Sequence, residues 1–311
     1  MSSIIASAPT KVIITGEHAV VYDYPAIACA VSKRIYVKIS PCNEEQIVFS
    51  EGLNLKADIS KEVPPEFEPI KRIVDILNVR SPFKCEIISD VPPACGLGTS
   101  AAVAVAFTKA LSTFIGIELD NTRISSIAYE AEKITHGKPS GIDNTLATFG
   151  GAILYRKSVG FRRKDAPNIK FIVVDSGQKR RTRDAVFHVK ELLESNREFV
   201  TKIFERISEI SKTVWNLLDS PDFQKMGELL NENHELLKML GLSTDKIEMI
   251  VKIAKDMNCY AAKITGAGMG GMVLVLPPQD NKEINKILAE YKKNGFNCFE
   301  LTLTNDGVRI E

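Results

Sequence analysis

A glycine-rich stretch, Gly96-Leu97-Gly98-Thr99-Ser100, stands directly before a run of small apolar residues. Glycine allows positive φ and lets a backbone approach a ligand closely. If a helix begins at Thr99, its first N–H groups are free and its amino-terminal end is partly positive, which suits a phosphate. The hydroxyls of Thr99 and Ser100 can also bind a phosphate or Mg²⁺. The stretch predicts an anion site, although taken alone a glycine-rich helix start is more often structural.

Two segments match the dinucleotide-binding pattern G-x-G-x-x-G/A, at 96–101 and 266–271. In the first, DVPPAC separates the loop from the preceding strand, and the acid at Glu118 or Asp120 leads into a helix instead of ending a strand. The second runs into the apolar strand MVLVL, so no helix amino-terminus faces a phosphate there. A Walker loop is excluded because no G-x-x-x-x-G-K-[ST] occurs. A nicotinamide-dependent enzyme stays only as an alternative.

The elements that must position this loop are mixed strands and helices. Short β-branched runs predict strands at 3–9, 11–16, 26–31, 34–40 and 84–89. Small apolar residues predict a buried helix over 101–115, and apolar residues at helical spacing predict another over 122–135, which GKPSGID breaks.

The second half of the chain begins with predicted strands at 152–155 and 171–175 and is largely helical from 184 to 255. Two further strands, 260–265 and 272–276, flank the segment GAGMGG, and a helix near 280–294 and a strand near 298–303 follow. Strands and helices do not alternate strictly, so the pattern favours α+β over a doubly wound sheet. The basic, polar stretch 156–168 is the predicted domain boundary.

Composition sets limits on the function. With 311 residues, 44% hydrophobic and 25% charged, the chain is an ordinary globular protein long enough for two domains. A net charge of +1 gives no general attraction to nucleic acid or membranes. No apolar run approaches the roughly 20 residues that span a bilayer. Six cysteines without C-x-x-C or zinc spacing, and no secretory signal, predict a cytoplasmic protein.

Three segments together carry a family resemblance. PTKVIITGEHAVVYDYPAIA (9–28), the loop from Pro92 and KITGAGMGGMVLVL (263–276) stand in the order and spacing of the three motifs of the GHMP kinases. The chain resembles that family over nearly its whole length, and within it the mevalonate kinase branch. GEHAVVY (16–22) and HGKPSGIDN (136–144) are the most specific stretches, and 175–182 and 231–244 also resemble that branch.

The resemblance implies an architecture that periodicity does not show. It is an α+β, two-domain GHMP kinase fold, with a ribosomal-S5-like amino-terminal domain at 1–165 and a ferredoxin-like carboxy-terminal domain at 166–311. A left-handed crossover is expected in the first domain, and the active site is expected in the cleft between the two. A homodimer is left open.

The resemblance also assigns roles in ATP-dependent phosphorylation of the C5 hydroxyl of (R)-mevalonate. Asp143 is the expected catalytic base and Lys11 its partner, while Ser100 and Glu132 are the expected Mg²⁺ ligands. A carboxylate is a weak base for an alcohol, so the proton is expected to move late and Asp143 to orient the hydroxyl as well. Helical periodicity alone does not choose Glu132 over Glu130, since both flank the apolar stripe of their helix.

The remaining assigned residues bind the two substrates. Those expected at ATP are Pro92, Pro93, Ala94, Cys95, Gly96, Leu97, Gly98, Thr99, Ser100, Ala101, Ala102, Gly266, Gly268 and Gly270. Those expected at mevalonate are Glu17, His18, Arg180 and Thr182. Within the basic run 179–181, any of Lys179, Arg180 or Arg181 can pair with the substrate carboxylate.

Departures from the family pattern remove no needed chemical group. Thr99 stands where Ser is common, Asp23 replaces a frequent Gly, and Thr10 replaces the usual Gly or Ser before the lysine.

Two other hypotheses remain. In the first, the chain is another GHMP kinase, which acts on the C3 hydroxyl of mevalonate, on phosphomevalonate, on homoserine or on a sugar. In the second, it is a ligand sensor with the same fold, and the complete set of catalytic residues disfavours this hypothesis.

Overall fold

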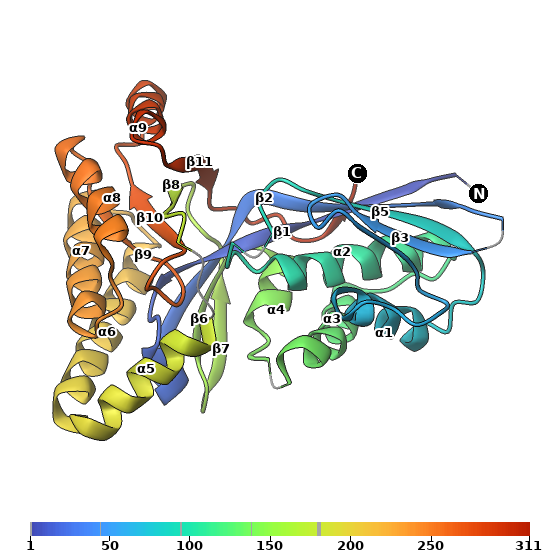
Figure 1. The fold of residues 1–311 in the computed structure, drawn as a ribbon, viewed down its shortest axis with the longest axis horizontal. Helices are drawn as coiled ribbons and strands as arrows, with labels where there is room; N and C mark the ends of the chain where they lie inside the picture. Colours follow the sequence, from blue (N-terminus) through green and yellow to red (C-terminus); the bar gives the residue numbers. More distant parts are fainter. Residues whose placement is uncertain (1, 44, 94, 138, 179–181) are drawn as a thin grey trace. The chain divides into compact units, whose positions relative to one another are not determined.

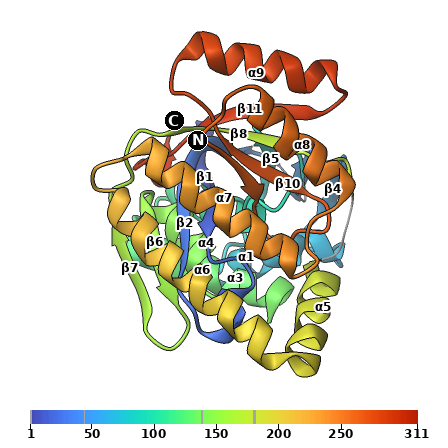
Figure 2. The same ribbon diagram turned by 90° about the vertical axis from the view of Figure 1, so that its left-hand side faces the viewer.

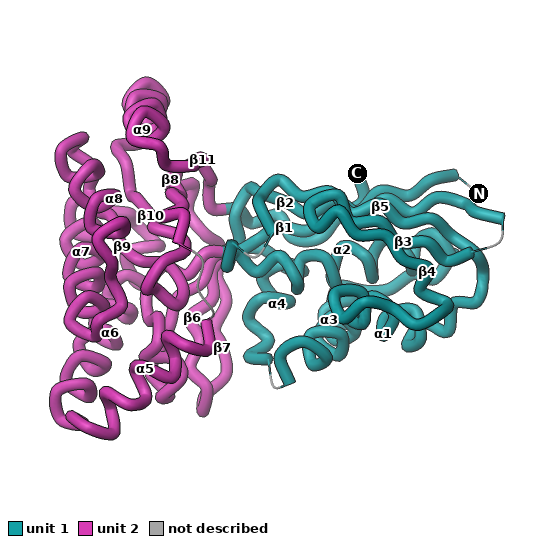
Figure 3. The backbone as a smooth tube through the Cα atoms, in the orientation of Figure 1, with its two compact units in different colours: residues 1–11, 30–151, 304–311 teal, residues 12–29, 152–303 magenta. Residues whose placement is uncertain are grey.

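A computed structural model describes residues 2–43, 45–93, 95–137, 139–178 and 182–311. The chain divides into two compact units, and each contains part of the first 29 residues (Figure 3). Unit 1 contains 1–11, 30–151 and 304–311, and unit 2 contains 12–29 and 152–303. These units are groups of residues in mutual contact, and the domain boundary expected at 165/166 stays a prediction.

Unit 1 is built on a mixed sheet in the order β12-β1-β2-β5-β3-β4. In this row β3 is parallel to β5, whereas β12 is antiparallel to β1, β2 to β5 and β3 to β4. The bounds of the strands are β1 Ile4–Thr15, β2 Ala26–Pro41, β3 Gln46–Ser50, β4 Leu55–Asp58, β5 Phe83–Ser89 and β12 Arg309–Ile310.

The four helices α1 to α4 all lie on the same face of this sheet (Figure 1). Their bounds, with that of a short 3₁₀ turn, are η2 Pro65–Phe67, α1 Glu68–Ile76, α2 Thr99–Phe114, α3 Asn121–His136 and α4 Ile142–Phe149. Helix α2 is the central one, because its alanines and valines pack against the sheet, α1, α3 and α4. Small side chains allow this close packing, so the start of α2 is held firmly in place.

Unit 2 has an antiparallel sheet in the order β11-β8-β10-β9. A hairpin of β6 and β7 pairs with the first residues of β2, Ala26–Cys29. The bounds are β6 Ala152–Arg156, β7 Gly160–Lys164, β8 Lys170–Asp175, β9 Ala261–Ile264, β10 Met272–Leu276 and β11 Asn297–Thr302.

Helices α7 and α8 contact β9, and α9 contacts β11 and β8. Helices α6 and α7 lie side by side (Figure 2). The bounds are η1 Ala19–Tyr22, α5 Thr182–Ser195, α6 Arg197–Leu217, α7 Phe223–Met239, α8 Asp245–Asp256 and α9 Asn281–Lys293. Asp222, Thr244 and Asp280 each cap a helix by accepting a hydrogen bond from its first turn, which explains where three of these helices begin.

The sequence predicted most of these elements but divided two of them wrongly. The separate strands expected at 3–9 and 11–16 are the single strand β1, because Pro9 has a φ that suits extended backbone. Those expected at 26–31 and 34–40 are the single strand β2. The polar residues Ser32 and Lys33 interrupt its apolar pattern without turning the chain. The sequence did not predict β3, β4, β7, β12, α1 or α4.

Candidate active site

The glycine-rich loop of unit 1 ends where α2 begins. Gly98 is the N-cap of α2 and has a φ of 70°, which L side chains rarely adopt. A Cβ on Gly98 would lie 2.8 Å from Cγ of Lys11 and 3.2 Å from Oδ2 of Asp143. Gly98 is therefore required both by its backbone conformation and by the space that these two side chains occupy. The amide of Lys11 donates to the carbonyl of Leu97 at 2.9 Å, which ties β1 to the loop.

Helix α2 presents its amino-terminal end at this loop. Its N-cap, Gly98, has no side chain to bond the N–H groups of the first turn, and that turn contains no acidic residue. The end of the helix is thus partly positive and has donors for an anion. Thr99 and Ser100, in the first turn, are half-buried.

Lys11 and Asp143 lie together beside Gly98. Lys11 is on β1 and Asp143 is in the first turn of α4, and Nζ lies 3.6 Å from Oδ2. The side chain of Lys11 is 10% exposed and that of Asp143 is 36% exposed. The carboxylate is therefore held by the lysine yet accessible to a ligand.

Ser100 and Glu132 form a second pair next to the first. The Ser100 hydroxyl donates to Oε1 of Glu132, on α3, at 2.5 Å. Burial raises the pKa of Glu132, and the hydrogen bond from Ser100 opposes this. His136, one turn later on α3, lies 3.6 Å from the other carboxylate oxygen. The side chain of Glu130 is instead 40% exposed and pairs with Lys133. The structure therefore distinguishes the two glutamates as candidate metal ligands, which helical periodicity did not.

The oxygens of Ser100 and Glu132 are of the type that Mg²⁺ prefers. No group of three or more His, Cys, Asp or Glu residues suited to a metal occurs in the described part of the chain. Mg²⁺ in phosphoryl-transfer sites usually takes only one or two protein carboxylates, with phosphate oxygens and water completing its shell. The pair therefore fits an ion that a nucleotide carries.

A cavity of about 470 Å³ in unit 1 adjoins the loop. Its volume is within the usual range of roughly 300–1,000 Å³ for ligand pockets. Phe67, Ile70 and Val103 form part of its apolar wall, and Thr99 and Ser100 line it as well. An apolar cavity that Thr99 and Ser100 also line suits a flat base whose phosphates extend toward the start of α2.

The glycine-rich segment of unit 2, 266–271, connects β9 to β10. The amide of Met269 donates to the carbonyl of Leu242 at 2.5 Å, and that of Gly271 donates to the carbonyl of Gln178 at 3.1 Å. A Cβ on Gly268 would lie 2.9 Å from the Leu242 oxygen, and one on Gly270 would lie 2.5 Å from the Gln178 oxygen. Close approach of the neighbouring backbone therefore requires these two glycines, whatever ligand the segment meets.

Glu17 and His18 are attached to the same segment. The Glu17 carboxylate is fully buried and forms an ion pair with Lys263, on β9. Nε2 of His18 lies 2.8 Å from the carbonyl oxygen of Ala267. Sequence reasoning missed Lys263. The sequence did contain one signal for it, a lysine within the otherwise apolar strand AAKI, because a buried lysine needs a charged or polar partner.

Some predicted residues are not described or lie apart. Ala94, and Arg180 with its neighbours Lys179 and Arg181, lie outside the described residues. Thr182 is exposed at the start of α5. The structure thus groups Lys11, Gly98, Ser100, Glu132 and Asp143 in unit 1. In unit 2 it groups Glu17 and His18 with the glycine-rich segment.

Comparison with known proteins identifies the class to which this arrangement belongs. The model of the GHMP kinase N-terminal domain matches residues 68–151, and that of the GHMP kinase C-terminal domain matches 214–297. The chain therefore belongs to the GHMP kinase family, and the predicted two-domain GHMP kinase fold is confirmed.

The relatives narrow the class further. A mevalonate kinase of Saccharolobus solfataricus is 34% identical over 97% of both chains. The crystal structure of the Methanococcus jannaschii mevalonate kinase matches with a TM-score of 0.85 at 32% identity, over 98% of this chain and 99% of that one. The L. major mevalonate kinase, solved in complex with R-mevalonate, has a TM-score of 0.85 at 26% identity and covers 97% of this chain and 96% of its own.

Proposed function

We propose that the chain is a mevalonate kinase that transfers the γ-phosphoryl group of ATP to the C5 hydroxyl of (R)-mevalonate. The observation that carries this is the likeness to mevalonate kinases over nearly the whole chain, one of them solved with R-mevalonate. The close grouping of Lys11, Asp143, Ser100 and Glu132 supports it, because phosphoryl transfer needs positioning and charge stabilisation above all. We propose the cytoplasm as its place of action, since the six cysteines of the sequence show no C-x-x-C pair and no zinc spacing.

The loop and cavity of unit 1 bind ATP in this proposal. The base occupies the cavity beside Phe67 and Ile70, and the phosphates meet the free N–H groups at the start of α2. Ser100 and Glu132 would hold Mg²⁺, and the ion would supply positive charge to neutralise the phosphates. Glycines 266, 268 and 270 contribute a tight turn to phosphate binding.

Asp143 and Lys11 act on the acceptor hydroxyl. Asp143 accepts the C5 hydroxyl proton as the oxygen–phosphorus bond forms and the bond from the γ-phosphorus to the β–γ bridging oxygen breaks. Lys11 keeps the carboxylate in place from its buried side, and its positive charge stabilises the negative charge that develops. His18 and Thr182 are proposed to border mevalonate, with a basic residue of 179–181 at its carboxylate.

An assay of ADP release tests the proposal. The purified chain is given Mg²⁺-ATP with (R)-mevalonate, 5-phosphomevalonate, homoserine or galactose, and phosphorus NMR locates the new phosphate. Phosphate on C5 of mevalonate alone is expected. Phosphate on C3, or activity with another alcohol only, would contradict the proposed substrate and retain the kinase chemistry. Nucleotide binding without turnover of any alcohol would instead support the ligand-sensor alternative.

A further inference from the structure

The segment GEH contains a strained turn. His18 has φ 60° and ψ −47°, and the amide of Ala19 donates to the carbonyl of Glu17 at 2.7 Å. This is a γ-turn with positive φ at its central residue, which is rare and strained. Such strain persists only where the surroundings hold the conformation, and it occurs preferentially at functional sites.

The side chains of the turn are held by one partner segment. Glu17 pairs with Lys263, the last residue but one of β9. His18 contacts the Ala267 carbonyl inside the glycine-rich segment. A third link comes from Thr265, whose hydroxyl donates to the Ile13 carbonyl at 2.9 Å. Residues 13–18 and 263–267 are thus connected at three points within unit 2.

Lys263 occupies an unusually demanding position. Its side chain is fully buried, as is that of Glu17, and Nζ also donates to the carbonyl of Ile264. Burial lowers the pKa of Lys263, and the charge and hydrogen bond of Glu17 oppose this. Burying two charges costs solvation energy that apolar side chains of similar size would avoid, so such a pair is weak evidence for stability. The pair thus requires an explanation other than stability.

We propose that Lys263 is a positioning residue for the glycine-rich segment. By fixing Glu17, it holds the γ-turn at His18, and His18 in turn holds the carbonyl of Ala267. The segment is then ordered before a nucleotide binds. Lys263 thus acts through Glu17, whose fully buried carboxylate does not contact mevalonate in this proposal. The kinetic part of this inference rests on the proposed kinase function, whereas its structural part does not.

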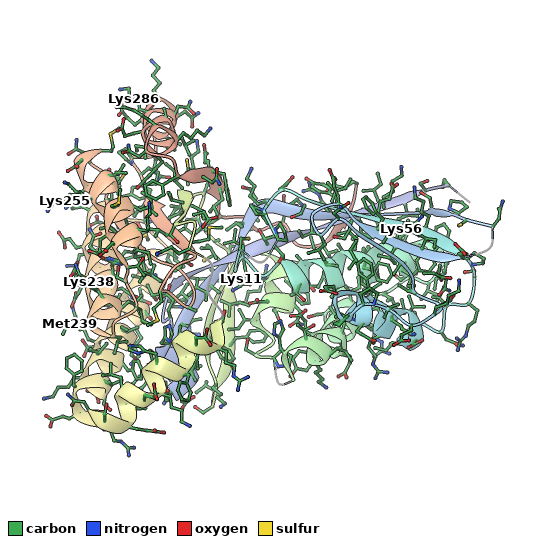
Figure 4. The ribbon with its side chains drawn as sticks, viewed as in Figure 1. Lys11, Lys56, Lys238, Met239, Lys255 and Lys286 are labelled. Atoms are coloured by element: carbon green, nitrogen blue, oxygen red, sulfur yellow. The ribbon has the colours of Figure 1, made fainter. Side chains whose placement is uncertain are left out.

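Two variants test the inference. Lys263→Met removes the charge at similar volume and takes from the buried Glu17 carboxylate the cation that faces it, which destabilises the fold. The double variant Glu17→Met/Lys263→Met removes both charges and is expected to recover the melting temperature. Lys286→Met is the matched control, because Lys286 pairs with Glu283 on the outer side of α9 and its side chain is 63% exposed (Figure 4).

Hydrogen exchange of the peptide 264–272 provides a measurement that does not depend on activity. The amides of Thr265, Met269 and Gly271 are hydrogen-bonded there and report its order. In the double variant we expect exchange of this peptide to be at least about 10-fold faster than in the wild type. We also expect kcat to be about 10- to 100-fold lower, with a raised KM for Mg²⁺-ATP, as for a displacement of about 1 Å. The α9 peptide 281–293 and the control variant are expected to stay unchanged.

The outcomes separate a positioning role from a structural one. If the double variant regains the wild-type melting temperature, exchange and kcat together, the pair only supports folding and the inference is wrong. If exchange rises but the wild type phosphorylates no alcohol, the positioning role stands and the proposed function fails. Should Lys263→Met not fold, the double variant decides the question alone.

Discussion

Each unit contains a buried lysine beside a carboxylate, and the two pairs differ in what they leave exposed. In unit 1, Lys11 lies 3.6 Å from Asp143, whose side chain is 36% exposed. In unit 2, Lys263 and Glu17 are both fully buried. A partly exposed pair, which we call the open pair, can contact a substrate. A fully buried pair can contact only other groups of the protein. We therefore propose that a lysine–carboxylate pair serves chemistry in unit 1 and positioning in unit 2.

The largest effect is expected from Asp143→Asn, which breaks the open pair. The amide cannot accept the proton, so kcat should fall about 100- to 10,000-fold, the usual contribution of general acid–base catalysis. The affinity for ATP, measured by calorimetry, and the melting temperature should change little. Asp165→Asn, at an exposed residue, is the control. Retention of more than a tenth of the wild-type kcat would remove Asp143 from the catalytic role.

A smaller effect is expected from Glu132→Gln, which keeps the shape of the side chain and loses its charge. The half-saturating Mg²⁺ concentration in the ADP-release assay should rise about 10- to 100-fold, in the range known for residues supporting a metal. Glu130→Gln on the same helix is the matched control, because Glu130 is exposed and pairs with Lys133. Equal Mg²⁺ requirements in the two variants would show that Glu132 is not a ligand.

The smallest effect concerns acid stability in unit 2. Burial opposes ionisation of Glu248, but hydrogen bonds from Lys238, Ser243 and His234 outweigh it and lower its pKa to about 2. A lowered pKa stabilises the fold above the unfolded value near 4.5, and this contribution is lost as the pH falls from there toward 2. In Glu248→Gln, the melting temperature should therefore decline less steeply below pH 5 than in the wild type.

His234 contributes in the same direction at a higher pH. Burial lowers its pKa, and Lys263 adds to this, although Glu248 opposes it. The folded state thus favours neutral His234, and this stabilisation decreases as the pH falls below the ordinary value of 6.5. Glu248→Gln should keep a decline between pH 6.5 and 5. A variant with the full wild-type decline below pH 5 would show that Glu248 does not cause it.

Local sequence explains only part of the site. The pattern around Gly98 predicted a helix start with an anion site, and α2 begins at Thr99 as that required. Family resemblance, not periodicity, selected Glu132, because the contact with Ser100 joins residues 32 positions apart. The Lys263–Glu17 pair was not predicted, since it joins residues 246 positions apart and only folding brings them together. A single lysine or glutamate in the sequence does not indicate which residue it will contact in the folded protein.

Residues 304–311 have a consequence for synthesis of the protein. They belong to unit 1, where β12 pairs with β1 and the Gly307 carbonyl accepts a hydrogen bond from Arg34 at 2.7 Å. On the ribosome, the sheet of unit 1 therefore cannot be completed until residues 304–311 have been synthesised. A stop codon just after Leu303 would spare every proposed catalytic residue. It would nevertheless leave the edge of β1 open, and an open edge invites pairing with other nascent chains.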